Sequence, residues 1–160
     1  MDDYEQELNE WRLLVGTAIL SFGNIEFATI KCLTHLPRDN ISKTTSSLPF
    51  GRRVDLIIEL LEGQKENAAI NSEFIIKLKR AKELAEWRNV LAHNPLATSV
   101  YEHKATGDLL LEKTIKAERK KGKEIDLPKL KELASEISSL SSEIYYSLSI
   151  CVGLTNEILP

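Results

Sequence analysis

Residues at every third or fourth position repeat along the first third of the chain, which is the spacing of one face of an α-helix. The repeating positions are Leu8, Trp11, Val15, Ala18, Phe22, Ile25 and Thr29. They predict one long helix from Glu5 to about Leu36, and Pro37 marks its end because proline interrupts helical hydrogen bonding. Gly16 and Gly23 lie inside this helix and weaken it by up to about 1 kcal/mol each. They are either tolerated weak points or positions where another helix approaches closely.

The middle of the chain reads as a loop followed by two more helices. Residues 37–49 are rich in proline, serine and threonine, a composition typical of a loop. A second helix is expected over residues 50–62, with Gly63 ending it. A third is expected to start at a cap formed by Asn71 or Ser72 and to run to about residue 93. The Asn-Pro pair that follows favours an extended backbone.

The pattern changes to an alternating one over residues 99–116, which predicts a small β-hairpin turning at Gly107. A basic loop follows at residues 119–123, and Asp126 is placed to cap a last helix over residues 127–159. The sequence therefore predicts an all-α fold over residues 1–160. We expect a single up-down four-helix bundle with a hairpin inserted before the last helix.

Composition narrows the classes of function. Hydrophobic residues make up 42% and charged residues 28% of the chain, as in ordinary globular proteins. The net charge of -3 gives no general attraction for polyanions, so any contact with nucleic acid must come from local clusters. Cys32 and Cys151 stand among apolar helical positions and are expected in the core of a protein from a reducing compartment. The acidic start of the chain favours the cytoplasm and no membrane association.

The third helix combines an apolar stripe with one charge. The stripe holds Phe74, Leu78, Ala81, Ala85, Arg88 and Ala92. A guanidinium in line with core positions must be paired or must face a cleft lined by protein, because an unpaired buried charge is costly. Asn89 and His93 lie on a polar stripe beside it, together with Lys82. Polar groups therefore converge at the end of this helix.

The string Arg88-Asn89-Val90-Leu91-Ala92-His93 resembles the Arg-x4-6-His motif of the HEPN superfamily. The similarity extends to the layout, with Phe22-Gly23-x2-Glu26 in a long first helix. Members of that superfamily are helical bundles, frequently homodimers, and often metal-independent endoribonucleases of toxin or defence systems. The resemblance implies catalytic roles for Arg88, Asn89 and His93, RNA as the substrate, and no cofactor or metal. It leaves open a separate antitoxin, although Pro95 stands where some members have a tyrosine that their partner modifies.

These residue types suit RNA cleavage without a metal. His93 can act as base or acid, because histidine titrates near neutral pH and a helix C-terminus favours its charged form. Arg88 offers a planar fork for phosphate oxygens, and Asn89 can orient or contact the phosphate. Five residues of helix separate Arg88 from His93 by about 140°, so one copy does not easily focus both on one phosphate. A twofold axis through this end would bring two of each together.

A second interpretation gives these residues structural roles. Glu26 lies among apolar positions of the first helix and needs a cationic partner, which Arg88 can be. His93 then merely caps the helix end, and the chain is a non-catalytic helical dimer that binds a regulatory partner or a nucleotide. His35 and His103 are expected at the surface, and no metal-ligand spacing occurs. The aromatic residues Trp11, Trp87, Tyr145 and Tyr146 are expected in the bundle or in a dimer interface, with a platform for nucleobases as the alternative.

Overall fold

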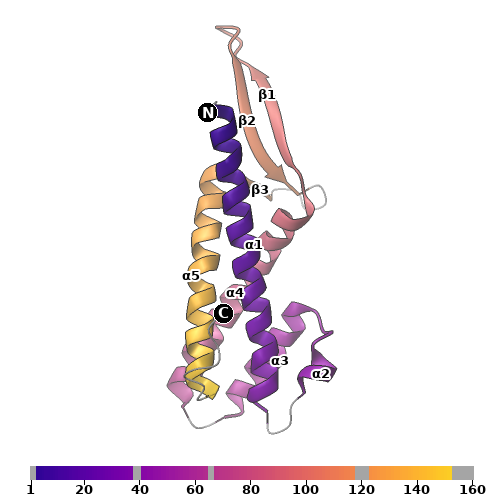
Figure 1. The fold of residues 1–160 in the computed structure, drawn as a ribbon, viewed down its shortest axis with the longest axis vertical. Coiled ribbons are helices and arrows are strands. Elements are labelled where there is room, and N and C mark those ends of the chain that lie inside the picture. Colours follow the sequence, from indigo (N-terminus) through magenta and orange to yellow (C-terminus); the bar gives the residue numbers. More distant parts are fainter. Residues whose placement is uncertain (1–2, 38–40, 65–66, 118–122, 153–160) are drawn as a thin grey trace.

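The computed structural model describes residues 3–37, 41–64, 67–117 and 123–152 (Figure 1). The chain is mostly helical, with several packed helices and a three-stranded antiparallel sheet before the last helix. The helices are α1 (Asp3–His35), α2 (Ser42–Thr45), α3 (Phe50–Glu62), α4 (Ala68–His93) and α5 (Leu127–Val152). The strands are β1 (Leu96–Glu102), β2 (Leu109–Lys116) and β3 (Glu124–Ile125).

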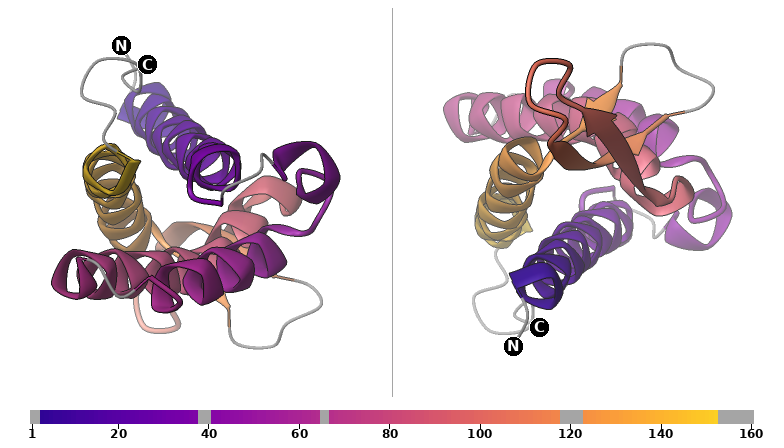
Figure 2. Two further views of the ribbon diagram at one scale, coloured as in Figure 1. Left: turned by 90° about the horizontal axis from the view of Figure 1, so that it is seen from below. Right: turned by 90° about the horizontal axis from the view of Figure 1, so that it is seen from above.

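The two long helices α1 and α5 lie side by side and run in the same direction, from the sheet toward the opposite end of the molecule (Figures 1 and 2). Near their starts the Glu10 carboxylate lies 2.7 Å from Nζ of Lys131. Helix α4 runs in the opposite direction, as the hydrogen bond from Lys77 near its start to Ser147 near the end of α5 shows. The predicted strict up-down order of four helices is therefore wrong, since its first and last helices would be antiparallel.

The segment between α1 and α3 explains this difference. Phe50 opens α3 and packs edge-to-face on Phe22 in the middle of α1, with ring centroids 5.2 Å apart. Helix α3 therefore starts beside the middle of α1 instead of at its end. The segment before it contains the short helix α2, which the polar composition did not predict.

Arg53, in the first turns of α3, is a buried cation that the sequence did not single out. Its Nε donates to Oγ1 of Thr29 in α1 at 3.0 Å. Its Nη1 donates to the carbonyl oxygens of Ser46 and Leu48 at 3.2 and 2.9 Å. Arg53 therefore ties the segment after α2 to both α1 and α3.

Helix α4 begins earlier than its predicted cap. Its N-cap is Asn67, with a left-handed backbone (φ 62°), instead of Asn71 or Ser72. Asn71 is buried inside the helix, and its side-chain nitrogen donates to the Leu61 carbonyl at the end of α3 at 3.2 Å. A polar residue that looks like a cap thus joins two helices. The predicted end of α3 before Gly63 is confirmed.

The predicted hairpin is part of a larger sheet. Strand β1 starts at Leu96, β2 pairs with it from Leu109 to Ile115, and β3 pairs with the end of β2. Gly107 has a positive φ of 71° in the connecting turn, as predicted. The two-residue strand β3 was not predicted because so short an element has no periodicity. The hairpin projects beyond the start of α1 (Figure 1).

The base of the hairpin is fixed to α1 by Lys113. This side chain is buried, its Nζ lies 2.5 Å from a Glu7 carboxylate oxygen, and it stands 4.2 Å from the centroid of the Tyr4 ring. The chain then enters α5, where the Asp126 carboxylate accepts the Lys129 backbone N–H at 2.8 Å. The predicted Asp126 cap is confirmed. The predicted stretches 119–122 and 153–159 lie outside the described residues.

Both cysteines are free thiols close to the core. Cys32 is fully buried, and burial raises the pKa of its thiol well above the ordinary value. Cys151 is half-buried, and burial raises its pKa as well. Thiols with raised pKa values are poor nucleophiles, which agrees with their predicted role as packing residues.

Among the described residues, α1 is long and apolar enough to cross a membrane by length and composition, with a mean hydropathy of 1.6 over its most apolar stretch. The same composition occurs in helices that are covered by protein on all sides. The core-facing side of α1 accounts for part of it, through buried residues such as Trp11, Phe22 and Ile25. The opposite side contributes the rest, through exposed residues such as Leu13, Leu20 and Phe27.

Candidate functional site

The motif occupies the last two turns of α4. The helix ends at His93 and Asn94 is extended (φ -126°, ψ 143°), as expected for a residue before proline. The Asn94 side chain donates back to the Val90 carbonyl at 2.9 Å, which closes the helix end. The backbone around the motif is therefore well defined.

Arg88 is held by two residues of α1. Its Nη2 bonds the Glu26 carboxylate, and its guanidinium carbon lies 5.0 Å from the centroid of the Phe22 ring. The Arg88 and Glu26 side chains remain 22% and 33% exposed. A guanidinium that stacks on a ring and pairs with one carboxylate is fixed in orientation without being sealed from solvent.

The stripe predicted to carry Arg88 is buried only in its first half. Phe74, Leu78 and Ala81 are buried, whereas Ala92 is exposed. Ala92 therefore does not occupy the core position that the helical wheel gave it. The buried residues of the last turns are instead Val90 and Leu91, which lie beside the stripe.

Asn89 and His93 are both exposed. In the described part of the chain, no side-chain hydrogen bond joins Arg88, Asn89 and His93 to one another. The structure thus brings Arg88 to Glu26, as the second interpretation anticipated, and leaves the histidine on a different side of the helix. One copy of the chain does not assemble the three residues around a single point.

Phe22 was the functional neighbour that sequence reasoning missed. The sequence pointed to a helical repeat and to the string Phe22-Gly23-x2-Glu26, but not to a contact with Arg88, although Phe22 lies four positions before Glu26 and therefore on the same side of α1. An aromatic ring and a carboxylate four positions apart on a helix can bind one guanidinium together. That spacing was the feature of the sequence from which the Phe22–Arg88 contact could have been predicted.

An apolar groove of about 470 Å³ adjoins the motif. It lies between α1, the end of α4 and the first strands. Its lining from α1 is Leu8, Trp11, Arg12, Val15, Gly16 and Ile19, and from the other elements Leu91, Asn94, Leu96 and Ile115. The motif therefore lies beside an open, mostly apolar surface of α1.

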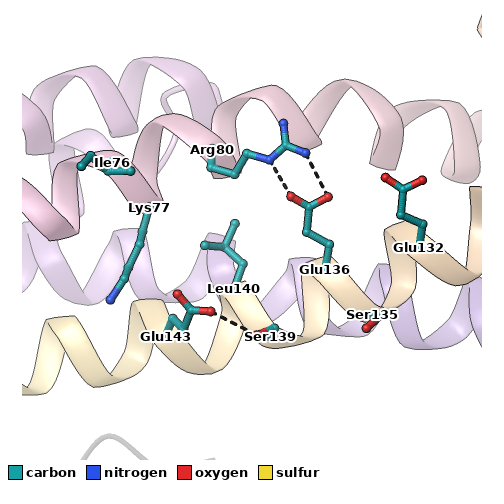
Figure 3. Close-up of a pocket in the computed structure, with 9 residues that line it drawn as sticks. All are labelled: Ile76, Lys77, Arg80, Glu132, Ser135, Glu136, Ser139, Leu140 and Glu143. Carbon is teal, nitrogen blue, oxygen red and sulfur yellow. Dashed lines mark hydrogen bonds and ion pairs between the residues drawn. The ribbon is translucent and has the colours of Figure 1, made fainter.

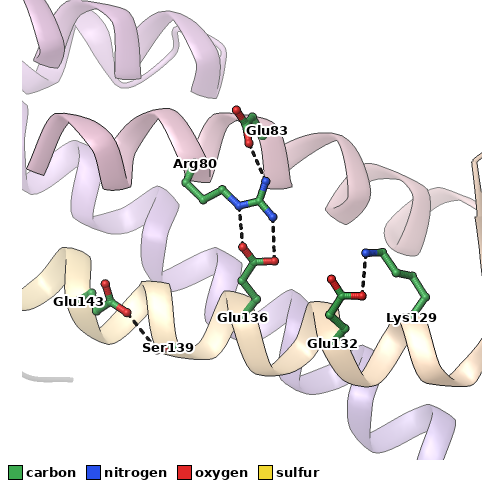
Figure 4. Close-up of polar contacts among 7 residues, drawn as sticks. All are labelled: Arg80, Glu83, Lys129, Glu132, Glu136, Ser139 and Glu143. Carbon is green, nitrogen blue, oxygen red and sulfur yellow. Dashed lines mark hydrogen bonds and ion pairs between the residues drawn. The ribbon is translucent and has the colours of Figure 1, made fainter. Parts of the chain in front are cut away.

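A larger groove of about 710 Å³ lies elsewhere, between α4 and α5 (Figure 3). Its central cation, Arg80, makes two bonds of 2.6 and 2.9 Å to Glu136 and one of 2.6 Å to Glu83 (Figure 4). These hydrogen bonds raise the pKa of the Arg80 guanidinium. The lining also includes Glu132 and Glu143. Because its carboxylates outnumber its cations, this groove is poorly suited to an RNA backbone.

The other candidate residues lie apart from the motif. His35 and His103 are exposed, as predicted, and His103 Nδ1 lies 3.2 Å from the Thr106 hydroxyl in the hairpin turn. Lys123 pairs with Glu86 and stands 4.9 Å from the centroid of the Trp87 ring. Trp11 and Tyr145 are buried, Trp87 is half-buried and Tyr146 is exposed. Within the described ranges, no group of three or more His, Cys, Asp or Glu residues is positioned to hold a metal ion.

The partial exposure of the Arg88 pair sets the effect of breaking it. We expect Glu26→Gln to lower the free energy of unfolding by about 1 kcal/mol, because solvent screens a pair that is open by a fifth to a third. Glu62→Gln, an exposed carboxylate at the end of α3, is the control and should change stability by less than about 0.5 kcal/mol. Urea denaturation measures both. Equal midpoints for the two variants would show that the ion pair contributes nothing.

Comparisons of the chain with protein-family models, with curated proteins and with solved structures found no match.

Proposed function

We propose that this chain is a HEPN-like, metal-independent endoribonuclease of toxin or defence type that works as a cytoplasmic homodimer. The observation that carries the proposal is the state of Arg88, which is oriented by Phe22 and Glu26 yet open to solvent. A partly exposed ion pair contributes little to stability, because solvent screens it. An oriented, accessible guanidinium is prepared to bind a phosphate.

The proposed chemistry divides the work among three residues at the end of α4. Arg88 binds the non-bridging oxygens of the scissile phosphate and stabilises the added charge of the transition state. His93 removes the proton of the 2′-hydroxyl or protonates the 5′-oxygen that leaves, and Asn89 contacts the phosphate. His93 and Arg88 diverge by about 140° on the helix. Each phosphate is therefore served by Arg88 of one copy and His93 of the other.

The mechanism predicts the products. Attack by the 2′-oxygen and loss of the 5′-oxygen leave a 2′,3′-cyclic phosphate and a free 5′-hydroxyl, and a chelator should not slow the reaction. The test is to incubate the purified chain with total RNA in EDTA and to identify the fragment ends by enzymatic labelling. Fragments with 5′-phosphates, or cleavage only after Mg²⁺ is added, would contradict the mechanism.

A second function is favoured by the Arg88–Glu26 contact itself. If that contact serves only to hold α4 on α1, the chain is a non-catalytic helical dimer that binds a protein or nucleotide partner. The two functions differ in the expected effect of Arg88→Lys. Lysine keeps the ion pair and the fold but loses the planar fork, so RNA cleavage should fall while partner binding should persist.

A further inference from the structure

The side of α1 that faces away from the core carries large apolar side chains at heptad spacing. Leu13, Leu20 and Phe27 are seven positions apart and remain 70%, 73% and 50% exposed. The buried face of the same helix lies on the opposite side. The outward side of a surface helix is ordinarily its most polar, so an apolar row here needs a covering surface. In Figure 2, α1 lies at the edge of the molecule.

Two glycines alternate with these side chains. A Cβ atom added at Gly16 or Gly23 would meet nothing within 4 Å. Among the described residues, no close approach therefore explains why a helix carries glycine at these two positions. A large side chain from outside could fit into each gap, because the missing Cβ lets it approach the helix backbone.

The residues of this side form a symmetric series about Ala18, which we call the outer face of α1. The outer face comprises Glu5, Asn9, Leu13, Gly16, Leu20, Gly23, Phe27 and Lys31. We propose that it packs antiparallel against the outer face of a second copy of this chain. The twofold axis crosses α1 at the level of Ala18, whose own side chain is buried on the opposite side of the helix. Leu13 then fills the gap at Gly23 of the second copy, and Leu20 fills the gap at its Gly16.

Charge fixes the direction of the packing. In the antiparallel arrangement Glu5 of each copy meets Lys31 of the other, and opposite charges at the ends of the interface attract. The dipoles of two antiparallel helices also favour each other. A parallel arrangement would place Glu5 against Glu5, leucine against leucine and glycine against glycine. The parallel arrangement would pair no opposite charges and would leave the gaps at the glycines unfilled.

The same twofold axis brings the Arg88–His93 segments of the two copies close together. This part of the inference rests on the proposed function, whereas the pairing of α1 does not. Arg88 contacts α1 at Glu26, eight positions beyond Ala18, and Asn94 lines the groove with α1 residues 8–19. The segment from Arg88 to Asn94 therefore lies along one side of α1 and extends to both sides of the twofold axis. A twofold axis perpendicular to the two helices places this segment of both copies on the same side of the dimer. Arg88 of one copy and His93 of the other then lie at the same end of the space between the two segments.

The pairing is tested by light scattering and analytical ultracentrifugation of the purified chain. We expect a dimer at tens of micromolar and a rise of at least about a hundredfold in its dissociation constant for Leu20→Glu, because two carboxylates would be buried. Gly16→Phe, which fills the gap at a position where an added Cβ atom meets none of the described residues within 4 Å, should act alike. Ile76→Glu, at a comparably exposed site on α4, is the matched control and should leave the dimer intact. A monomeric parent, or a dimer insensitive to Leu20→Glu and Gly16→Phe, overturns the proposal.

A charge exchange tests the direction. Glu5→Lys and Lys31→Glu should each weaken the dimer, and the double variant should restore it, because residue 5 faces residue 31 of the other copy. A parallel dimer would stay weak in the double variant, since like charges would still meet.

Sedimentation with phosphatidylcholine vesicles tests whether the apolar outer face of α1 binds lipid instead. Vesicle binding that Leu20→Glu abolishes would assign the outer face to lipid and overturn the proposal.

The two proposals can fail separately. A dimer that is sensitive to Leu20→Glu but never cleaves RNA keeps the α1 pairing and counts against the ribonuclease. Cleavage by a monomer that does not respond to Leu20→Glu would support the ribonuclease activity and overturn the α1 pairing.

Discussion

Replacing His93 with alanine is expected to lower the rate of RNA cleavage by about a hundredfold to ten-thousandfold, because general acid-base catalysis by histidine contributes roughly two to four powers of ten. The side chain is exposed at the helix end, so its loss should cost less than about 1 kcal/mol of stability. The measurement is a single-turnover cleavage assay in EDTA beside a thermal melt. A large kinetic effect with an unchanged melt assigns the residue to chemistry instead of folding.

The control for this variant is His103→Ala, which removes an exposed histidine from the hairpin turn. It should leave cleavage and stability as they are in the parent. A folded His93→Ala protein that cleaves RNA as fast as His103→Ala would rule out His93 as a catalyst.

Arg53→Ala is expected to produce the largest loss of stability, about 3 kcal/mol. The variant would leave the Thr29 hydroxyl without its donor and two backbone carbonyls without theirs, and it would open space beneath the segment after α2. The effect should be larger than that of Glu26→Gln because Arg53 is buried and its bonds are shielded from water. Urea denaturation followed by circular dichroism gives the free energy of unfolding.

The neighbouring arginine supplies a matched control. Arg52 precedes Arg53 on the same turn of α3 but is exposed. Arg52→Ala should change the free energy of unfolding by no more than about 0.5 kcal/mol. If the two variants unfold at the same urea concentration, Arg53 does not hold the segment as its contacts indicate.

The long helices were predictable because each carries a periodic apolar face and recognisable ends. Pro37 ends the first, Asp126 begins the last, and the alternation around Gly107 marked the hairpin. The direction of α3 relative to α1 was not predictable. It depends on the Phe22–Phe50 contact, which joins residues far apart in the sequence. Nor could polarity show whether Asn71 caps a helix or bonds inside the core.

The candidate site was predictable as a set of residues but not as a geometry. The wheel placed Arg88 near the core, and Glu26 was its anticipated partner, which the structure confirms. The helical periodicity could not show that the buried side of α4 shifts to Val90 and Leu91 and leaves Ala92 exposed, because that depends on where the neighbouring elements lie. The outer face of α1 was visible only as two glycines until the exposure of Leu13 and Leu20 was known.

The central claim is that two copies of the chain build each active site from Arg88 of one and His93 of the other. It is tested most directly by mixing Arg88→Lys with His93→Ala and measuring RNA cleavage in EDTA. Each variant alone should be nearly inactive. Half of the exchanged dimers should be mixed, and each mixed dimer should hold one intact site of two, so the mixture should regain about one quarter of the parent rate. A mixture that exchanges subunits and remains as inactive as its components would contradict the shared site.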